Sequence, residues 1–320
     1  MKILTVQNRM GIGDMVIFLP FIEAISKKFS TPVSILVKEN SKASQFLENN
    51  KYIDKIIILD RDNNKKGSHD GIRGFLKLIN KLKEYNYDKV FIFNSSIRFN
   101  LISRLSGIKE IYQYPLFQKK NQHIIKTAQN FLKDKINLNV ESNPEILIDD
   151  SFVDKAKLEY KISKKQLNIL LGIGGSGQTK RIPFEIFLKF MRLVHAKHDC
   201  RFFLATGKNI EEQTILNKIL ESEFKNKCLP LDKLDLKRIL PIIKNCNIAV
   251  CNDSSFSHLS SALGVETIVL MSDTPLLYGS YSPRMYPIIP DGENTVTHNT
   301  RGKDRINPNK IFEQLNNILN

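Results

Sequence analysis

The sequence predicts an α/β protein built from two Rossmann-like domains, each with a parallel sheet. Short apolar runs alternate with stretches of helical periodicity along the 320 residues, a pattern typical of parallel sheets joined by crossover helices. Each half opens with a strand-like run, at 2–6 and at 167–173, that leads into a glycine-containing turn and a helix. A chain of this length also favours two domains, because single domains usually hold about 100 to 200 residues.

The first half is expected to contain four strands, which we place at 2–6, 33–37, 55–59 and 89–93. Between the first two, apolar side chains from Phe18 to Phe29 recur at helical spacing. Pro20 lies within this stretch and should kink the helix or mark a restart.

The second half repeats the same plan. We place its strands at 167–173, 201–205, 248–251 and 267–271, and its helices at 183–197, 210–220, 233–244 and 309–319. The periodicity weakens before this half, and the polar stretch 137–150 indicates an interdomain region within 140–165. The predicted division is 1–155 for the first domain, 156–305 for the second, and 306–320 for a C-terminal helix.

The chain is strongly basic, with 48 Lys and Arg against 33 Asp and Glu and a net charge of +15. Such an excess indicates an anionic partner or simply a lysine-rich solvated surface. Nucleic acid fits poorly, because the basic residues are not clustered with aromatic ones. None of the four cysteines forms a C-x-x-C pair, so reduced buried thiols are expected rather than zinc ligands or disulfides.

A glycine turn follows the first predicted strand, where Gly11-Ile12-Gly13-Asp14 opens a helix. Glycines there let backbone amides approach a ligand at the helix N-terminus. Asp14 stands at the carboxyl end of a parallel strand, the edge at which open α/β sheets bind ligands. Its carboxylate can take a proton from an attacking hydroxyl; the structural alternative is a helix cap.

A second glycine-rich segment, GIGGSGQTKR at 172–181, follows the strand that opens the second half. It contains G-x-G-x-x-G, which suggests a dinucleotide site. That site also requires an acidic residue at the tip of the next strand, where this chain has Thr206-Gly207-Lys208. The loop runs on to Lys180 and Arg181 and favours a diphosphate held by amides, hydroxyls and a lysine. The alternative is a plain surface loop.

The third segment, NDSSFSH at 252–258, follows an apolar strand and opens a helix. Ser254 and Ser255 offer hydroxyls and exposed amides to a phosphate, and Asp253 and His258 add polar groups. A Ser-His-Asp hydrolase fits poorly, because neither serine lies in a G-x-S-x-G turn. The alternative is a helix cap with a core histidine.

Two further patterns resemble metal sites without meeting their requirements. Asp60-Arg61-Asp62 starts like a calcium loop but lacks the glycine and the final glutamate, so we interpret 60–71 as a mobile basic loop that carries Lys65 and Lys66. His195 and His198 are interpreted as surface residues near a helix end, and no metal site is expected.

Together the motifs resemble the lipopolysaccharide heptosyltransferase family, also called glycosyltransferase family nine. The resemblance rests on Gly13-Asp14 followed by Pro20, on Lys180-Arg181-x-Pro183 after the glycine loop, and on the pattern DSSxxxHxxxALG at 253–264. The motifs occur in the family order and span most of the chain. The resemblance implies a GT-B fold, in which two Rossmann-like domains face each other across a cleft, and an inverting sugar transfer without an essential metal.

The resemblance also implies roles for individual residues. Asp14 matches the catalytic base, Lys180 matches the lysine on the donor diphosphate, and Lys65 and Lys66 resemble a basic loop that meets the phosphorylated acceptor. The implied donor-binding set in the sequence is Gly13, Gly174, Gly175, Ser176, Thr179, Lys180, Glu211, Glu212, Asp253, Ser254, Ser255 and His258.

By this resemblance the substrates are a nucleotide sugar, for which ADP-heptose is the family's best-known donor, and a lipopolysaccharide-type or other surface glycan; no cofactor is implied. Ser254-Ser255 replaces the family's usual Thr-Gly, which leaves the donor sugar open. The alternatives are a sugar-nucleotide epimerase and a non-catalytic protein that binds nucleotide sugars or an anionic surface. No apolar run is long enough to span a membrane, so the protein is expected in the cytoplasm, with peripheral contact at the inner membrane through its basic surface.

Overall fold

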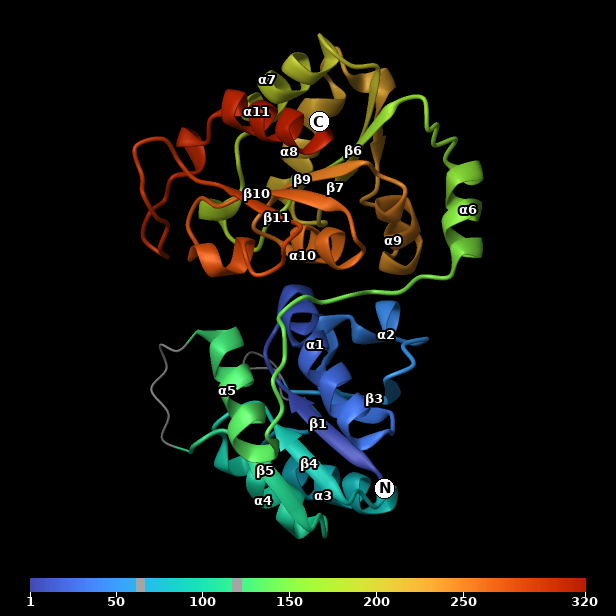
Figure 1. The fold of residues 1–320 in the computed structure, drawn as a ribbon, viewed down its shortest axis with the longest axis vertical. Coiled ribbons are helices and arrows are strands. Elements are labelled where there is room, and N and C mark those ends of the chain that lie inside the picture. The colour runs from blue at the N-terminus through green and yellow to red at the C-terminus, as the bar shows by residue number, and fades with distance from the viewer. Residues whose placement is uncertain (62–66, 117–122) are drawn as a thin grey trace. The chain divides into compact units, whose positions relative to one another are not determined.

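The computed structural model describes residues 1–61, 67–116 and 123–320. The chain divides into two compact units, Met1–Pro144 and Glu145–Asn320, and each contains a parallel sheet with helices packed on it (Figure 1). The boundary predicted after residue 155 falls inside α6 (Asp150–Glu159), which belongs wholly to the second unit. Asn245 of that unit fixes this helix, since its Nδ2 donates to the Val153 carbonyl at 2.8 Å.

The described part of the first unit forms a five-stranded parallel sheet with the strand order β3-β2-β1-β4-β5. Its strands are β1 (Ile3–Gln7), β2 (Val33–Lys38), β3 (Ile53–Leu59), β4 (Lys89–Ile92) and β5 (Glu110–Gln113). The four predicted strands are confirmed. β5 was missed because it is a short edge strand with the sequence EIYQ, and none of its side chains is fully buried.

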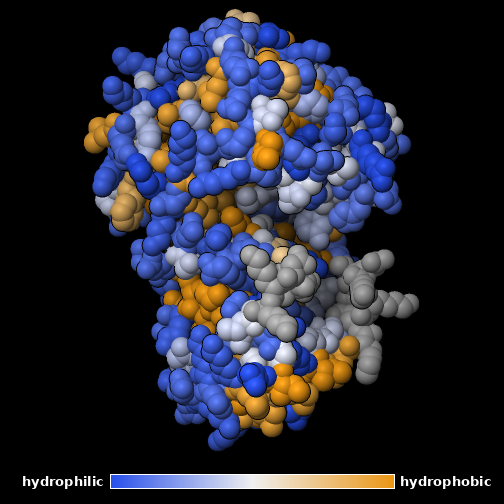
Figure 2. All heavy atoms as spheres, turned by 180° about the vertical axis from the view of Figure 1, so that it is seen from behind, coloured by the Kyte–Doolittle hydropathy of each residue, from blue (hydrophilic) through white to orange (hydrophobic). Residues whose placement is uncertain are grey.

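Helices cover both faces of this sheet. They are α1 (Ile12–Phe29), α2 (Ala43–Phe46), α3 (Gly71–Tyr85), α4 (Ile97–Leu105) and α5 (Ile124–Ile136). α1 does not restart at Pro20, which is buried within one continuous helix. Leu78 of α3 and Phe99 of α4 pack on one face of the sheet. The outer side of these two helices is partly apolar as well, and Figure 2 shows hydrophobic residues gathered at the lower end of the view, where α3 and α4 lie.

The second unit contains a parallel sheet with the order β11-β10-β9-β6-β7-β8. Its strands are β6 (Leu167–Gly172), β7 (Cys200–Ala205), β8 (Cys228–Pro230), β9 (Ile248–Asn252), β10 (Glu266–Leu270) and β11 (Met285–Ile288). The four predicted strands are again confirmed. The two edge strands, β8 and β11, were missed, since each is short and contains a proline, which normally argues against a strand.

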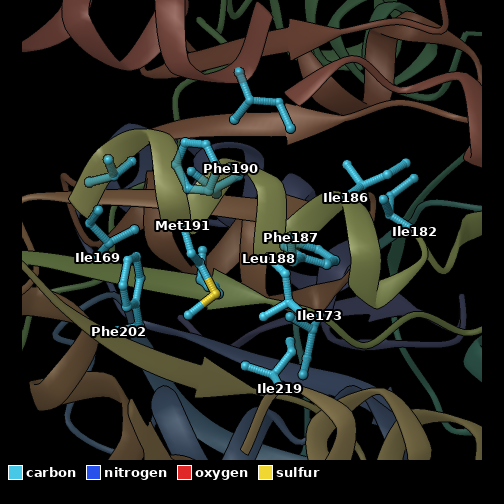
Figure 3. Close-up of a cluster of buried hydrophobic side chains, with 14 of the residues drawn as sticks. Ile169, Ile173, Ile182, Ile186, Phe187, Leu188, Phe190, Met191, Phe202 and Ile219 are labelled. Carbon is cyan, nitrogen blue, oxygen red and sulfur yellow. The ribbon is translucent and has the colours of Figure 1, made fainter. Parts of the chain in front are cut away.

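The main core of the second unit lies under α7 (Phe184–His195), α8 (Ile210–Leu220) and α11 (Pro308–Leu319). Phe187 and Phe190 of α7 point into a cluster that includes Ile169 of β6 and Phe202 of β7 (Figure 3). Ile311 and Leu315 of α11 are buried in the same core, so the C-terminal helix is part of this unit. α9 (Leu236–Lys244) and α10 (Ser255–Ala262) complete the unit.

The four cysteines are all free thiols, as predicted, and Cys200, Cys246 and Cys251 are buried. Burial raises the pKa of the Cys251 thiol to about 12, which makes it a poor nucleophile and metal ligand at neutral pH. Among the residues that the structure describes, no helix is both long and apolar enough to cross a membrane.

Candidate active site

The loops of interest in the second unit lie at the carboxyl edge of its sheet. β6 and β9 are neighbours, and the chain proceeds from β6 towards β7 on one side and from β9 towards β10 on the other. Such a reversal of strand order leaves a crevice beyond the carboxyl ends, where open α/β sheets bind their ligands. The two predicted phosphate loops, which follow β6 and β9, flank this point.

An ion pair joins the two loops. Lys180, in a short 3-10 turn (Gln178–Lys180), places its Nζ 2.7 Å from Oδ2 of Asp253, directly after β9. The Asp253 side chain is 5% exposed and that of Lys180 is 24% exposed. Burial, the largest single influence, raises the pKa of Asp253, but the charge and hydrogen bond of Lys180 together with neighbouring groups outweigh it, and the pKa of the carboxyl is lowered. The ammonium has three donors, so Lys180 can bind a second anion while it holds Asp253.

His258 of α10 lies beside this pair. Its Nδ1 is 2.8 Å from the Tyr281 hydroxyl, and the two rings stack with centroids 5.6 Å apart. Burial lowers the pKa of His258 to about 4, although the Asp253 charge acts in the opposite direction. The imidazole is therefore neutral at physiological pH, and the cluster carries one positive charge, on Lys180, and one negative charge, on Asp253.

This histidine should make stability depend on pH. The pKa of His258 in the folded protein is depressed below the ordinary value of 6.5. The contribution of the neutral imidazole to folding stability is therefore complete above pH 6.5 and is lost as the pH falls towards 4. Between pH 7 and pH 5 the titration of His258 is expected to lower the free energy of unfolding by about 2 kcal/mol. His258→Gln should not show this contribution to the pH dependence. Urea denaturation of both proteins at the two pH values measures the difference; identical pH dependence would contradict a buried neutral imidazole.

Backbone contacts hold the loops in place. Asn252, at the end of β9, donates from Nδ2 to the carbonyls of Ile173 and Gly174 at 2.9 and 3.1 Å. The Ser272 hydroxyl, after β10, donates to the Thr179 carbonyl at 2.8 Å. The glycine loop is therefore held by hydrogen bonds from the ends of two neighbouring strands.

Two hydroxyl groups at this edge are buried and have no hydrogen-bond partner among the described residues. In the described residues, neither Ser254 Oγ at the start of α10 nor Thr206 Oγ1 at the end of β7 has a hydrogen-bond partner. Buried hydroxyls are normally satisfied, and the N-terminus of α10 adds backbone donors and a favourable dipole for an anion. With Lys180, the edge has the donors that a diphosphate requires.

The two adjacent acids of α8 differ in their surroundings. Glu212 is 7% exposed; its Oε1 accepts from the Gly175 amide at 2.7 Å and its Oε2 accepts from Asn209 Nδ2 at 2.6 Å. Glu211 is exposed, pairs with Arg181 and accepts from Gln178 Nε2 at 2.7 Å. Glu212 therefore clamps the glycine loop, whereas Glu211 is open to a ligand's hydroxyl groups.

The position of the Glu212 carboxylate explains why residue 174 of the loop is a glycine. A Cβ on Gly174 would lie 2.5 Å from Glu212 Oε1 and 3.2 Å from the Thr206 Cα. Gly174→Ala should therefore displace the carboxylate and lower the free energy of unfolding by about 1–3 kcal/mol. Gly177→Ala is the matched control, because its Cβ would meet nothing closer than 3.9 Å and should cost less than about 0.5 kcal/mol. Chemical denaturation that gives equal stabilities for the two variants would contradict the clamp.

In the first unit, Asp14 lies in the first turn of α1, directly beyond the central strand β1. Gly11 precedes the helix with φ of 106°, a conformation that favours glycine. The Asp14 carboxylate is 23% exposed and lies 3.4 Å from Arg9 Nη1. The dipole of a helix N-terminus favours a negative charge at such a position, and a carboxylate can serve as a proton acceptor.

The structure thus joins only part of the predicted donor set. Lys180, Asp253 and His258 form one cluster, and Glu212 is bonded to Gly175. Gly13 lies in the first unit, Ser176 is exposed, and Lys65 and Lys66 lie outside the described residues. The sequence did not predict Tyr281, because no motif surrounds it. Asn252 belongs to the third predicted segment, but its hydrogen bonds to the glycine loop were not predicted.

The described ends of the predicted loop 60–71 contact each other. The Ser68 amide donates to Asp60 Oδ2 at 2.7 Å, and Arg61 Nε lies 3.0 Å from Asp70 Oδ1. These contacts join the two ends of the loop, and its predicted mobility stays a prediction. Among the residues that the structure describes, no group of three His, Cys, Asp or Glu side chains could hold a metal ion.

Known proteins resemble this chain in sequence and in fold. The sequence profile of glycosyltransferase family 9 (heptosyltransferase) matches residues 75–305. Lipopolysaccharide heptosyltransferase 1 of Campylobacter coli is 22% identical over 324 residues, which cover 92% of this chain and 90% of the relative.

Two solved structures share the fold. The ADP-heptose lipopolysaccharide heptosyltransferase II of E. coli has a TM-score of 0.74 and 16% identity, with 100% of this chain and 98% of that chain covered. The E. coli heptosyltransferase WaaC with ADP has a TM-score of 0.73 and 15% identity, with coverages of 99% and 100%. These likenesses establish the GT-B fold. Because the profile covers well over half of the chain, the protein belongs to glycosyltransferase family 9, the heptosyltransferases, and is a glycosyltransferase.

Proposed function

We propose that the protein transfers a heptose or a related hexose, with inversion, from a nucleoside-diphosphate donor to a lipopolysaccharide-type acceptor. The observation that carries the proposal is the Lys180–Asp253 pair, 2.7 Å apart, at the reversal of strand order beside the N-terminus of α10. The names of the similar proteins support these substrates. Two are called lipopolysaccharide heptosyltransferases, and a third was solved with ADP.

The donor diphosphate binds to Lys180 and to the amides and hydroxyls at the start of α10. An ionised Asp253 can accept hydrogen bonds but has no proton to donate, so it cannot donate to a phosphate oxygen. Its part in this proposal is to hold Lys180 in position and to accept from a hydroxyl of the sugar. Glu211, which is exposed at the start of α8, accepts from the ribose hydroxyls, while Glu212 stays bonded to the loop.

The reaction is a single displacement. The acceptor oxygen attacks the anomeric carbon, and the bond from that carbon to the diphosphate breaks on the opposite face, which inverts the configuration. The bonding electron pair leaves on the diphosphate oxygen, where Lys180 stabilises the added negative charge. We assign Asp14 as the base that takes the proton of the acceptor hydroxyl. No step requires a metal ion.

A donor panel tests the proposal. Thermal unfolding is measured with ADP-, UDP-, GDP- and dTDP-sugars, and we expect ADP-heptose to raise Tm most, because a ligand of the native state stabilises it. The preferred donor is then incubated with and without a lipopolysaccharide acceptor. Release of nucleoside diphosphate only in the presence of acceptor supports transfer. Conversion of the donor without an acceptor would indicate an epimerase, and tight binding without any turnover would indicate a non-catalytic protein.

A further inference from the structure

We propose that the outer face of α3 and α4 in the first unit docks on an anionic lipid bilayer. Five aliphatic side chains make up this α3–α4 face, and all are exposed: Ile72 (80%), Leu76 (53%), Ile97 (53%), Leu101 (45%) and Leu105 (52%). They recur every four residues along each helix, so each helix presents one apolar ridge to solvent.

The two ridges lie side by side. The Arg98 guanidinium of α4 stacks over the Phe75 ring of α3 at 5.2 Å, and Ser106, directly after α4, donates to the Ile79 carbonyl of α3 at 3.3 Å. The opposite sides of both helices are buried in the core of the first unit. The exposed side chains therefore form one surface, which lies in the region of hydrophobic residues at the lower end of Figure 2.

Basic residues surround this surface. Arg73, Lys77 and Lys83 lie on the solvent side of α3, Arg104 lies in the last turn of α4, and Lys109 lies directly before β5; all five are exposed. Of the nearby acids, Glu110 is already paired with Lys89. An apolar face with a rim of Lys and Arg is the pattern of an interfacial helix, whose apolar side enters the bilayer while the cations meet lipid phosphates.

The charge favours a bilayer over a second copy of this chain. A symmetric dimer would bring two such basic rims together, on a protein that already carries a net charge of +15. The composition also disfavours a protein partner, because the centres of protein interfaces are rich in Trp and Tyr, whereas the α3–α4 face is entirely aliphatic. Patches of this kind on a soluble unit mark interaction sites.

The inference rests on the proposed function for one point only: docking on a bilayer brings the enzyme to an acceptor that is anchored in the membrane. It goes further by locating the contact on named helices. Binding to a bilayer does not depend on sugar transfer, so the two proposals can fail separately.

The test is sedimentation of the full-length protein with vesicles of phosphatidylcholine alone or mixed with phosphatidylglycerol. Wild type should bind the anionic vesicles and leave the neutral ones largely free, and added salt should weaken binding. Ile72→Glu/Leu101→Glu should lower the partition coefficient by about tenfold or more. Phe152→Glu/Leu158→Glu on α6 is the matched control, since those side chains are also exposed, at 53% and 80%, and the charge change is the same.

A second variant, Ile72→Gln/Leu101→Gln, removes the apolar side chains at constant charge and should also weaken binding; circular dichroism checks that each variant is folded. The proposal is overturned if the α6 control loses as much binding as the Glu variant, if wild type binds neither kind of vesicle, or if ultracentrifugation shows a dimer that only the α3–α4 variants disrupt. Transfer to a delipidated, water-soluble acceptor should be unchanged in these variants. Vesicle binding by a wild-type protein that transfers no sugar would leave docking intact and remove the proposed function.

Discussion

Replacement of Asp14 by Asn is expected to lower kcat by about a hundredfold or more, with donor affinity nearly unchanged. The amide has the shape of the carboxylate and can keep a contact with Arg9, whose Nη1 lies 3.4 Å from Asp14, but it cannot take up the acceptor's proton. The donor contacts that we propose lie in the second unit and are untouched by the substitution.

Initial rates at saturating donor and acceptor give kcat, and calorimetry with the donor gives the affinity. Glu23→Gln is the matched control, because Glu23 is another acid of α1, paired with Lys27 at 2.5 Å, and its loss should leave kcat within about twofold of wild type. Turnover of Asp14→Asn near the wild-type value would remove Asp14 as the base and leave the donor site standing.

Asp14 could be singled out from sequence because its position depends only on local order. A strand, a glycine turn and a helix follow one another within 3–29, and that order alone puts the residue at the carboxyl edge of a sheet. The central strands were found for a similar reason, since buried parallel strands are continuous apolar runs. The edge strands β5, β8 and β11 are half-solvated and short, so they leave no such run.

The ion pair at the centre of the site could not be read from local patterns. Lys180 and Asp253 are separated by 73 positions, and they meet because β6 lies beside β9, a pairing that local periodicity does not determine. The same holds for Glu211 and Glu212. They are neighbours with the same chemistry, and only the packing against Gly175 decides that Glu212 is the loop clamp.

Lys180→Ala is expected to weaken donor binding by about 2–3 kcal/mol, because it removes a charge-assisted contact with the diphosphate. It also removes the partner of a carboxylate that is 5% exposed. Burial raises the pKa of Asp253, and Lys180, the largest of the influences that lower it, is then missing. At neutral pH the variant presents the incoming diphosphate with a negative group that nothing neutralises.

Two measurements separate these effects. In Lys180→Ala/Asp253→Asn the carboxylate is gone, so calorimetry should show a smaller loss of donor affinity than in Lys180→Ala alone. In the single variant, donor binding should strengthen as pH falls, since a raised pKa lets Asp253 take up a proton and lose its charge, whereas in wild type the lowered pKa keeps Asp253 ionised over that range. A donor Kd in Lys180→Ala equal to that of wild type would place the diphosphate elsewhere, and equal losses in the single and double variants would mean that Asp253 does not face the donor's charge.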